Sequence, residues 1–198
     1  MKKIAITGGI GSGKSTVLEL IKDQGFPVFS CDEIYKEIIV SKEYIQKIKE
    51  NFPTAVKNGL IDKQILSALI FKDEKKRCML NQIAHPLIMK RLFWKMDLSN
   101  YNLVFAEVPL LFEGNFENLF DAVIVVKRDL KSRINSVATR DNLTAIEVES
   151  RINAQFLYDS PKGQIRIKNS NAYVIDNNTS IQNLLVQLNN TINAIKIL

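Results

Sequence analysis

Apolar and polar positions at the start of the chain predict a strand, a glycine-rich turn and a helix in succession. Residues 3–7 form an apolar run of strand length. After the turn, apolar side chains recur at helical spacing until Gly25 ends the helix; they are Val17, Leu18, Leu20 and Ile21. The chain is therefore predicted to begin with a strand, a loop and a helix.

The next part of the pattern is mostly helical. Residues 27–29 predict a second short strand, and Asp32 opens a segment whose apolar residues again lie at helical spacing. From residue 42 to about 96 the spacing is helical almost throughout, which predicts an inserted helical region at about 41–97. We expect three interruptions in it: residues 51–53, residues 58–59 and Pro86.

Strands and helices alternate in the last part of the chain. Apolar, strand-length runs lie at 101–106, 122–126 and 173–175, and helical spacing lies at 129–138, 144–155 and about 180–195. Such alternation indicates a parallel sheet buried on both faces, hence an α/β fold. We expect one domain, divided as follows: a core at about 1–40, 98–138 and 170–198, the inserted helical region, and a lid at about 139–169.

Composition is that of a globular protein. The 198 residues are 46% apolar and 24% charged, which is enough apolar material for one sizeable core. Cys31 and Cys78 match no zinc pattern, so we expect two reduced thiols. The apolar stretch at the start ends at Gly8, too early for a signal peptide or a membrane span, so we expect a cytoplasmic protein without a membrane partner. A net charge of +6 suits phosphates, nucleic acid or simply a solvated basic surface.

The glycine-rich turn has the sequence of a phosphate-binding loop. Residues 8–15, Gly-Gly-Ile-Gly-Ser-Gly-Lys-Ser, match G-x-x-x-x-G-K-[ST]. The alternative is an ordinary glycine-rich turn, but the strand before the motif and the helix after it favour a phosphate-binding loop. Glycines let successive N–H groups point at phosphate oxygens, and the helix N-terminus adds positive charge. Lys14 is expected to reach the β- and γ-phosphates of ATP, and the Ser15 hydroxyl to bind Mg²⁺. The predicted ATP-binding residues of the loop are Gly9, Ile10, Gly11, Ser12, Gly13, Lys14, Ser15 and Thr16.

Phosphoryl transfer to a hydroxyl also needs a proton acceptor and positive charge. Asp32, after the second strand, is a candidate base, with a helix N-cap as the alternative. Glu107 directly follows the run 101–106, where P-loop proteins place an acid that polarises a magnesium-bound water; a structural carboxylate is the alternative. Arg140, between two predicted helices, is a candidate lid residue supplying charge, with a solvated basic face as the alternative.

In their order along the chain, these motifs resemble the dephospho-coenzyme A kinase family. The resemblance rests on T-G-G-I-G-S-G-K-S-T at 7–16, H-P at 85–86 and P-L-L-F-E at 109–113, and it spans nearly the whole chain. It implies a three-layer α/β/α P-loop fold with a helical acceptor subdomain and a lid. It also implies transfer of the ATP γ-phosphate to the ribose 3′-hydroxyl of dephospho-coenzyme A, the last step of coenzyme A biosynthesis.

The resemblance also assigns roles to single residues. Asp32 matches the second acid of the family's D-x-D segment and so becomes the general base, although Ser30 replaces the first acid. Arg140 matches the lid arginine, whereas a second family arginine is replaced by Ser136, with Arg133 as the candidate substitute. Lys14, Asp32 and Arg140 are therefore the predicted catalytic residues.

Two further groups of residues receive binding roles from the resemblance. Asn177 follows the last short strand and is expected near the adenine of ATP. The predicted acceptor-binding residues are Asp32, His85, Glu107, Pro109, Leu110 and Leu111. From sequence alone, a lone histidine is more often structural, and Leu-Leu-Phe is more often core.

Two alternatives stay open at this stage. One is another P-loop kinase, of the nucleoside monophosphate or shikimate type. The other is a nucleotide-gated regulator or nucleic-acid-binding adaptor, suggested by the net charge and the basic cluster at 72–77, although Asp73 and Glu74 interrupt that cluster. We expect ATP and dephospho-coenzyme A as partners, no nucleic acid, and a monomer or weak homo-oligomer.

Overall fold

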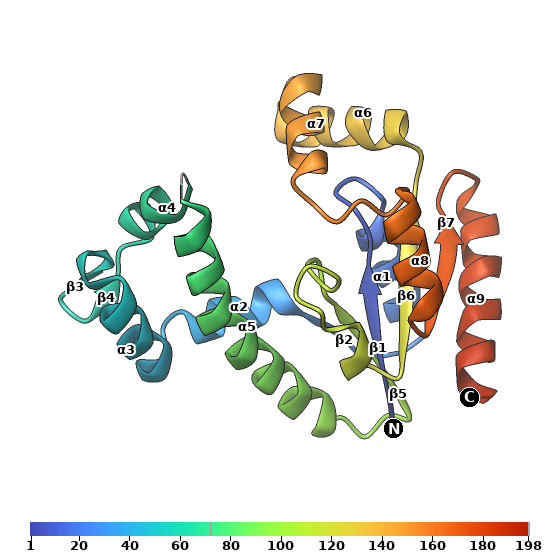
Figure 1. Cartoon of the computed structure of the whole chain (residues 1–198). Coiled ribbons are helices and arrows are strands. Elements are labelled where there is room, and N and C mark those ends of the chain that lie inside the picture. Colours follow the sequence, from blue (N-terminus) through green and yellow to red (C-terminus); the bar gives the residue numbers. More distant parts are fainter. Residues whose placement is uncertain (72, 198) are drawn as a thin grey trace. The chain divides into compact units, whose positions relative to one another are not determined.

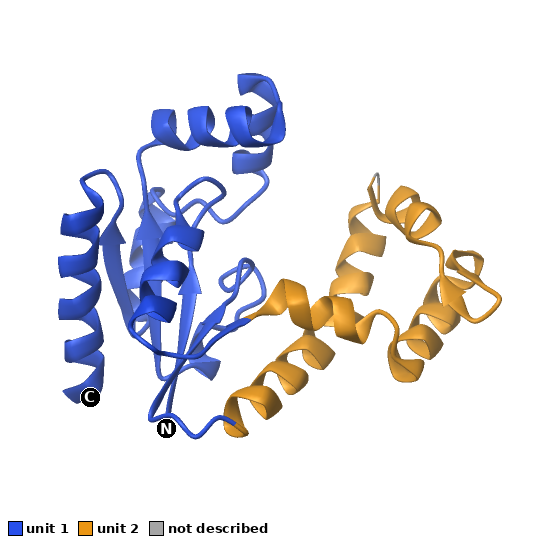
Figure 2. Ribbon diagram, turned by 180° about the vertical axis from the view of Figure 1, so that it is seen from behind, with its two compact units in different colours: residues 1–29, 99–198 blue, residues 30–98 orange. Residues whose placement is uncertain are grey.

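The computed structural model describes residues 1–71 and 73–197, so Lys72 of the basic cluster lies outside the described residues. The chain divides into two compact units, coloured separately in Figure 2. Unit 1 comprises Met1–Phe29 and Ser99–Leu198, and unit 2 is Ser30–Leu98. The sequence pattern placed the helical insertion at about 41–97, whereas unit 2 also includes the helix that starts at Cys31.

A five-stranded sheet forms the centre of unit 1 (Figure 1). Its strand order is β2-β5-β1-β6-β7, with β1, β5, β6 and β7 paired in parallel. The bounds are β1 Lys2–Thr7, β2 Val28–Ser30, β5 Leu103–Glu107, β6 Ala122–Lys127 and β7 Ala172–Asp176. The predicted parallel sheet and its strands are therefore confirmed.

Helices cover both faces of the sheet, because its central strands are apolar on both sides. Helices α1 (Lys14–Asp23) and α9 (Ile181–Ile197) share one apolar cluster with the sheet, which includes Ile21 and Leu188. Figure 1 shows α8 (Pro161–Asn169) in front of the strands, with α1 behind them. Because β1 and β6 are parallel neighbours, their carboxyl ends lie beside each other at one edge of the sheet.

Unit 2 is helical apart from one short hairpin. Its elements are α2 Cys31–Ile38, α3 Lys42–Asn51, the 3-10 helix η1 Pro53–Ala55, β3 Val56–Lys57, β4 Leu60–Ile61, α4 Lys63–Phe71 and α5 Glu74–Asp97. The predicted interruption at 58–59 is confirmed and is the hairpin turn, where Asn58 and Gly59 both have positive φ.

Pro86 does not interrupt a helix, contrary to the sequence-based expectation. It lies inside the 24-residue helix α5, which continues to Asp97. A proline removes one backbone donor from a helix, but the hydrogen bonds on either side remain. Buried residues on both sides of Pro86, including Ala84 and Met89, hold the helix in place.

In unit 1, helices α6, α7 and α8 lie between β6 and β7 along the chain. Helix α6 spans Leu130–Asp141, α7 spans Ala145–Asn153, and α8 was not predicted from the sequence. Arg140 lies in the last turn of α6 rather than in a connection, because the helix continues until Asn142 adopts a left-handed conformation. Among the described residues, no helix is both long and apolar enough to cross a membrane.

Candidate active site

The glycine-rich loop joins β1 to α1 at the carboxyl edge of the sheet. Gly11 and Gly13 have φ values of 77° and 88°, a left-handed conformation that L side chains rarely adopt. Space is short as well, because a Cβ atom at Gly11 would lie 2.8 Å from the Arg133 carbonyl oxygen and one at Gly13 would collide with Asn177 Nδ2. The loop conformation therefore depends on glycine at both positions.

Lys14 folds back over the loop that it follows. Its Nζ donates to the carbonyl oxygens of Gly8 at 2.9 Å and Gly9 at 3.3 Å. Ser15 in the first turn of α1 is exposed, whereas Ser12 is buried and its Oγ has no hydrogen-bond partner among the described residues. The loop thus presents an ammonium group and a serine hydroxyl at the N-terminus of a helix, where anions bind.

The donor groups at this edge suit Mg²⁺ only when substrate phosphates supply further ligands to the ion. Among the described residues, no group of three or more histidine, cysteine or acidic side chains lies close enough together to hold a metal. Mg²⁺ usually keeps several waters and is bound through one or two protein groups together with substrate phosphates. Ser15 at the loop and Glu107, the last residue of β5 and the register partner of Ile6, fit that mode.

Ile10 is held from both sides by segments distant in sequence. Its N–H donates to Gln155 Oε1 at 2.8 Å, and its carbonyl oxygen accepts from Arg133 Nε at 2.9 Å. The Ile10 side chain packs against an apolar cluster of α6 and α7 that contains Val137 and Val148. The phosphate loop is thereby attached to the helices that follow β6.

Asn177 and Tyr158 hold the loop at its two ends. Asn177 Nδ2 donates to the Ser12 carbonyl oxygen at 2.9 Å, so the predicted ATP-binding asparagine lies directly against the loop. The Tyr158 hydroxyl lies 3.0 Å from Thr7 Oγ1 at the end of β1. Burial, as the largest cause, raises the pKa of Tyr158 to about 12, so it is a neutral hydrogen-bonding group at physiological pH.

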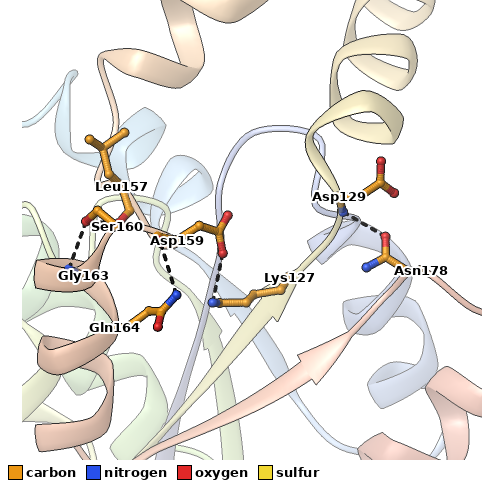
Figure 3. A network of polar contacts seen from close by, with 8 residues as sticks. All are labelled: Lys127, Asp129, Leu157, Asp159, Ser160, Gly163, Gln164 and Asn178. Atoms are coloured by element: carbon orange, nitrogen blue, oxygen red, sulfur yellow. Dashed lines mark hydrogen bonds and ion pairs between the residues drawn. The ribbon is translucent and has the colours of Figure 1, made fainter.

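A network of polar contacts lies at the carboxyl ends of β6 and β7 (Figure 3). Lys127, the last residue of β6, donates from Nζ to Asp159 Oδ1 at 3.0 Å. The Asp129 N–H donates to Asn178 Oδ1 at 2.8 Å, which fixes the start of α6 against the turn after β7. Asp159 stands two residues before α8, so the network connects the segment before α8 to the strand edge that carries the loop.

The segment at 109–113 packs against the connection between α7 and α8. Leu111 and Phe112 are fully buried, and the Phe112 ring stacks on Phe156 with 4.6 Å between centroids. Glu113 Oε1 accepts from the Phe156 N–H at 2.7 Å. Pro109 is half-buried and Leu110 is 41% exposed, so Leu110 is the leucine of this segment that presents surface.

Asp32 and His85 both belong to unit 2. Asp32 is exposed in the first turn of α2, and the N-cap of that helix is Ser30, so the N-cap alternative for Asp32 is wrong. His85 is half-buried on α5, and burial lowers the pKa of its imidazole below the usual value. Unit 1 contains all the other predicted site residues.

Two arginines of α6 differ sharply in surroundings. Arg140 is exposed, and its Nε and Nη2 donate to the two carboxylate oxygens of Asp141 at 2.7 and 2.9 Å. That ion pair raises the pKa of Arg140 further above its usual value. Arg133 is only 7% exposed and lies against the phosphate loop.

The parallel sheet, the phosphate loop at its edge and the lysine folded over that loop define a P-loop kinase fold. The family model for dephospho-CoA kinase matches residues 2–183. A dephospho-CoA kinase of Thermus thermophilus is 34% identical over 181 residues, covering 91% of this chain and 85% of the relative. The chain belongs to the dephospho-CoA kinase family, so the kinase prediction is confirmed over the regulator and adaptor alternatives.

Solved structures agree with this assignment. The crystal structure of the Thermus thermophilus protein TT1252 superposes with a TM-score of 0.81 at 33% identity, covering 98% of this chain and 96% of that one. A dephospho-CoA kinase from Campylobacter jejuni gives a TM-score of 0.67 at 25% identity, with the same coverage. Family membership also favours this acceptor class over nucleoside monophosphates and shikimate.

Most of the contacts that hold the loop have no signal in the sequence. Gln155 and Tyr158 carry no local motif, and nothing in the sequence spacing connects them to residues 7–13. Arg133 did carry a signal, because it stands four residues before the buried Val137 on the apolar face of α6. A charged residue at such a position indicates a specific buried partner.

Proposed function

We propose that the chain transfers the γ-phosphate of ATP to the ribose 3′-hydroxyl of dephospho-coenzyme A, giving coenzyme A and ADP. The observation that carries this proposal is the match to the dephospho-CoA kinase family over residues 2–183, which includes the whole phosphate loop. This reaction is the known role of the family and the last step of coenzyme A biosynthesis.

ATP binds, in this proposal, at the loop from Gly9 to Thr16. The backbone N–H groups of the loop donate to phosphate oxygens, and Lys14 moves its ammonium from the Gly8 and Gly9 carbonyls to the β- and γ-phosphates. Asn177 supports the loop through Ser12 and contacts the nucleotide on the adenine side.

Mg²⁺ is the proposed metal, and its sites are the Ser15 hydroxyl and, through a water, Glu107. When bound, the ion neutralises charge on the β- and γ-phosphates during transfer. The exposure of Ser15 leaves its hydroxyl open to solvent, where a phosphate-bound ion requires it.

Asp32 is the proposed general base, which takes the proton of the acceptor hydroxyl. Its exposure leaves the carboxylate open to a substrate. His85, Glu107, Pro109, Leu110 and Leu111 are the proposed acceptor contacts. Of these, Leu111 is fully buried in the present structure and Leu110 is exposed.

Arg140 is the proposed lid arginine, which stabilises charge on the transferring phosphoryl group. To do so it has to exchange Asp141 for phosphate, because Arg140 Nε and Nη2 both donate to the Asp141 carboxylate in the present structure. Its 63% exposed side chain is free to make that change.

The experiment that tests the function is ADP release from ATP and Mg²⁺ with dephospho-coenzyme A offered beside shikimate, AMP and CMP. We expect stimulation by dephospho-coenzyme A alone. Stimulation by another acceptor instead, or by none, would overturn the proposed substrate, and omission of Mg²⁺ in the same assay tests the metal.

The remaining sequence-based predictions stay proposals. They are a cytoplasmic location, a monomer or weak homo-oligomer, and activity independent of nucleic acid. Size-exclusion chromatography with light scattering tests the second, and unchanged turnover in the presence of added RNA or DNA tests the third.

A further inference from the structure

Arg133 is a buried cation with hydrogen-bonding capacity left over. An arginine has five N–H donors, and in this side chain Nε alone is engaged, with the Ile10 carbonyl oxygen at 2.9 Å. The two Nη groups make no hydrogen bond to any described residue. None of the Arg133 nitrogens is among the fully buried polar atoms that lack a partner, so the Nη groups open to solvent.

These free Nη groups lie over the phosphate loop. A Cβ atom at Gly9 would collide with Arg133 Nη2 and would lie 3.4 Å from Nη1, so the guanidinium rests directly on the Gly9 backbone. Gly9 also receives the Lys14 ammonium on its carbonyl oxygen at 3.3 Å. Two cations from different helices therefore converge on one residue of the loop.

The local charge balance favours an anion at this point. Asp159 is the carboxylate that interacts with Arg133, and it is already bound to Lys127. Arg133 and Lys127 therefore share this carboxylate, which Lys127 already engages directly. Burial of a guanidinium with open donors is costly, and a phosphate is the partner that its planar fork geometry matches.

We propose that Arg133 binds the γ-phosphate of ATP through its Nη groups while Nε holds the Ile10 carbonyl. The terminal phosphate is indicated because Lys14, which converges on the same glycine, is the residue assigned to the β- and γ-phosphates. Arg133 then acts in substrate binding, before the transition state, and discriminates ATP from ADP. The inference rests on the proposed use of the loop for ATP.

Calorimetric binding of ATP and of ADP to the full chain tests this role, with wild type compared with Arg133→Met and Arg133→Lys. We expect Arg133→Met to raise the Kd for ATP by about tenfold to a hundredfold, the range for one or two charge-assisted hydrogen bonds, and the Kd for ADP by less than about threefold. Arg133→Lys keeps the charge on a single donor group, so we expect an intermediate loss for ATP, and this variant serves if the methionine variant does not fold.

Two control variants separate phosphate binding from support of the loop. Gln155→Leu releases Ile10 on its other side without a change in charge, so it should weaken ATP and ADP to the same extent. Arg140→Met removes the other arginine of α6 and should leave both Kd values near those of wild type. Equal losses for ATP and ADP in the Arg133 variants, or no loss, would reduce Arg133 to a loop support and overturn the inference.

The inference and the proposed function fail in distinguishable ways. A selective loss of ATP affinity in an enzyme that dephospho-coenzyme A does not stimulate would remove the proposed acceptor and leave the role of Arg133 standing. Normal turnover with dephospho-coenzyme A and unchanged ATP affinity in Arg133→Met would do the reverse. Failure of wild type to bind ATP would overturn both.

Discussion

The phosphate loop of unit 1 and the candidate acceptor residues of unit 2 are supported very differently. Around the loop, Arg133, Gln155 and Asn177 each hold a backbone group, and Tyr158 holds the end of β1. Asp32 is exposed and its side chain makes no hydrogen bond or ion pair with a described residue. A loop that directs several N–H groups at phosphate needs its backbone held at several points, whereas a base needs only one accessible carboxylate.

Among the substitutions considered, we expect a change at Lys14 to lower activity the most. Lys14→Ala removes the ammonium from the most supported part of the site, and we expect kcat to fall by about 10⁴-fold, within the range for a cation that stabilises a transferring phosphoryl group. ADP release measures the loss, and the thermal unfolding midpoint should stay near that of wild type. Near-normal turnover would mean that the loop is not the site of transfer.

Asp32→Asn tests the candidate base in unit 2, whose side chain has no supporting contact with a described residue. The amide cannot accept the hydroxyl proton, so we expect kcat to fall by about 10²- to 10⁴-fold with little change in ATP affinity. Steady-state kinetics with both substrates varied make the measurement. A loss below tenfold would leave Asp32 a positioning role only and remove the proposed base.

Arg140→Ala tests whether this exposed arginine stabilises the transition state of phosphoryl transfer. We expect kcat to fall by about tenfold to a hundredfold while the Kd for ATP changes little, because its charge matters most when the phosphoryl group is in transfer. Arg133→Met should show the opposite division between the two parameters. If Arg140→Ala weakens ATP binding and kcat equally, the two arginines do not divide the work as proposed.

The smallest expected effect concerns His85. Because burial holds the pKa of its imidazole below 6.5 in the folded state, the unfolded chain binds the proton first as pH falls. Stability contributed by neutral His85 is therefore present above pH 6.5 and is lost as pH falls toward the folded-state pKa. His85→Gln should reduce the drop in unfolding temperature between pH 7.5 and 5.5 by on the order of 1 °C, measured by calorimetry; an unchanged drop would contradict this.

Much of the fold was predictable because its signals are local. The strands β1, β5 and β6 are continuous apolar runs, and Asn58-Gly59 marks a turn by its backbone preference. Helix α8 was missed because it has few apolar residues, although Ser160 as N-cap followed by Pro161 was a usable start signal. Pro86 misled because the cost of one missing backbone donor was weighed without the packing on either side.

In the candidate site, too, the residues of local motifs could be predicted and the contacts between distant segments could not. The loop motif predicted Lys14 and Ser15, because the residues that bind phosphate are consecutive in the sequence. The core alternative for Leu-Leu-Phe is confirmed, because Leu111 and Phe112 are fully buried. No pattern in the sequence predicted that Gln155 and Arg133 would hold Ile10. Burial and pairing depend on which segments meet, and spacing along a helix does not report that.

Local sequence patterns were enough to predict a parallel α/β sheet with a phosphate loop after its first strand, because alternating apolar runs and the loop motif are short-range properties. Which arginine of α6 lies on that loop depends on how distant segments meet in the fold. Arg133 and Ile10 are separated by 123 residues, and their hydrogen bond exists because β1 and β6 pair side by side in the sheet. Contacts of that kind follow from strand order, which no local pattern encodes.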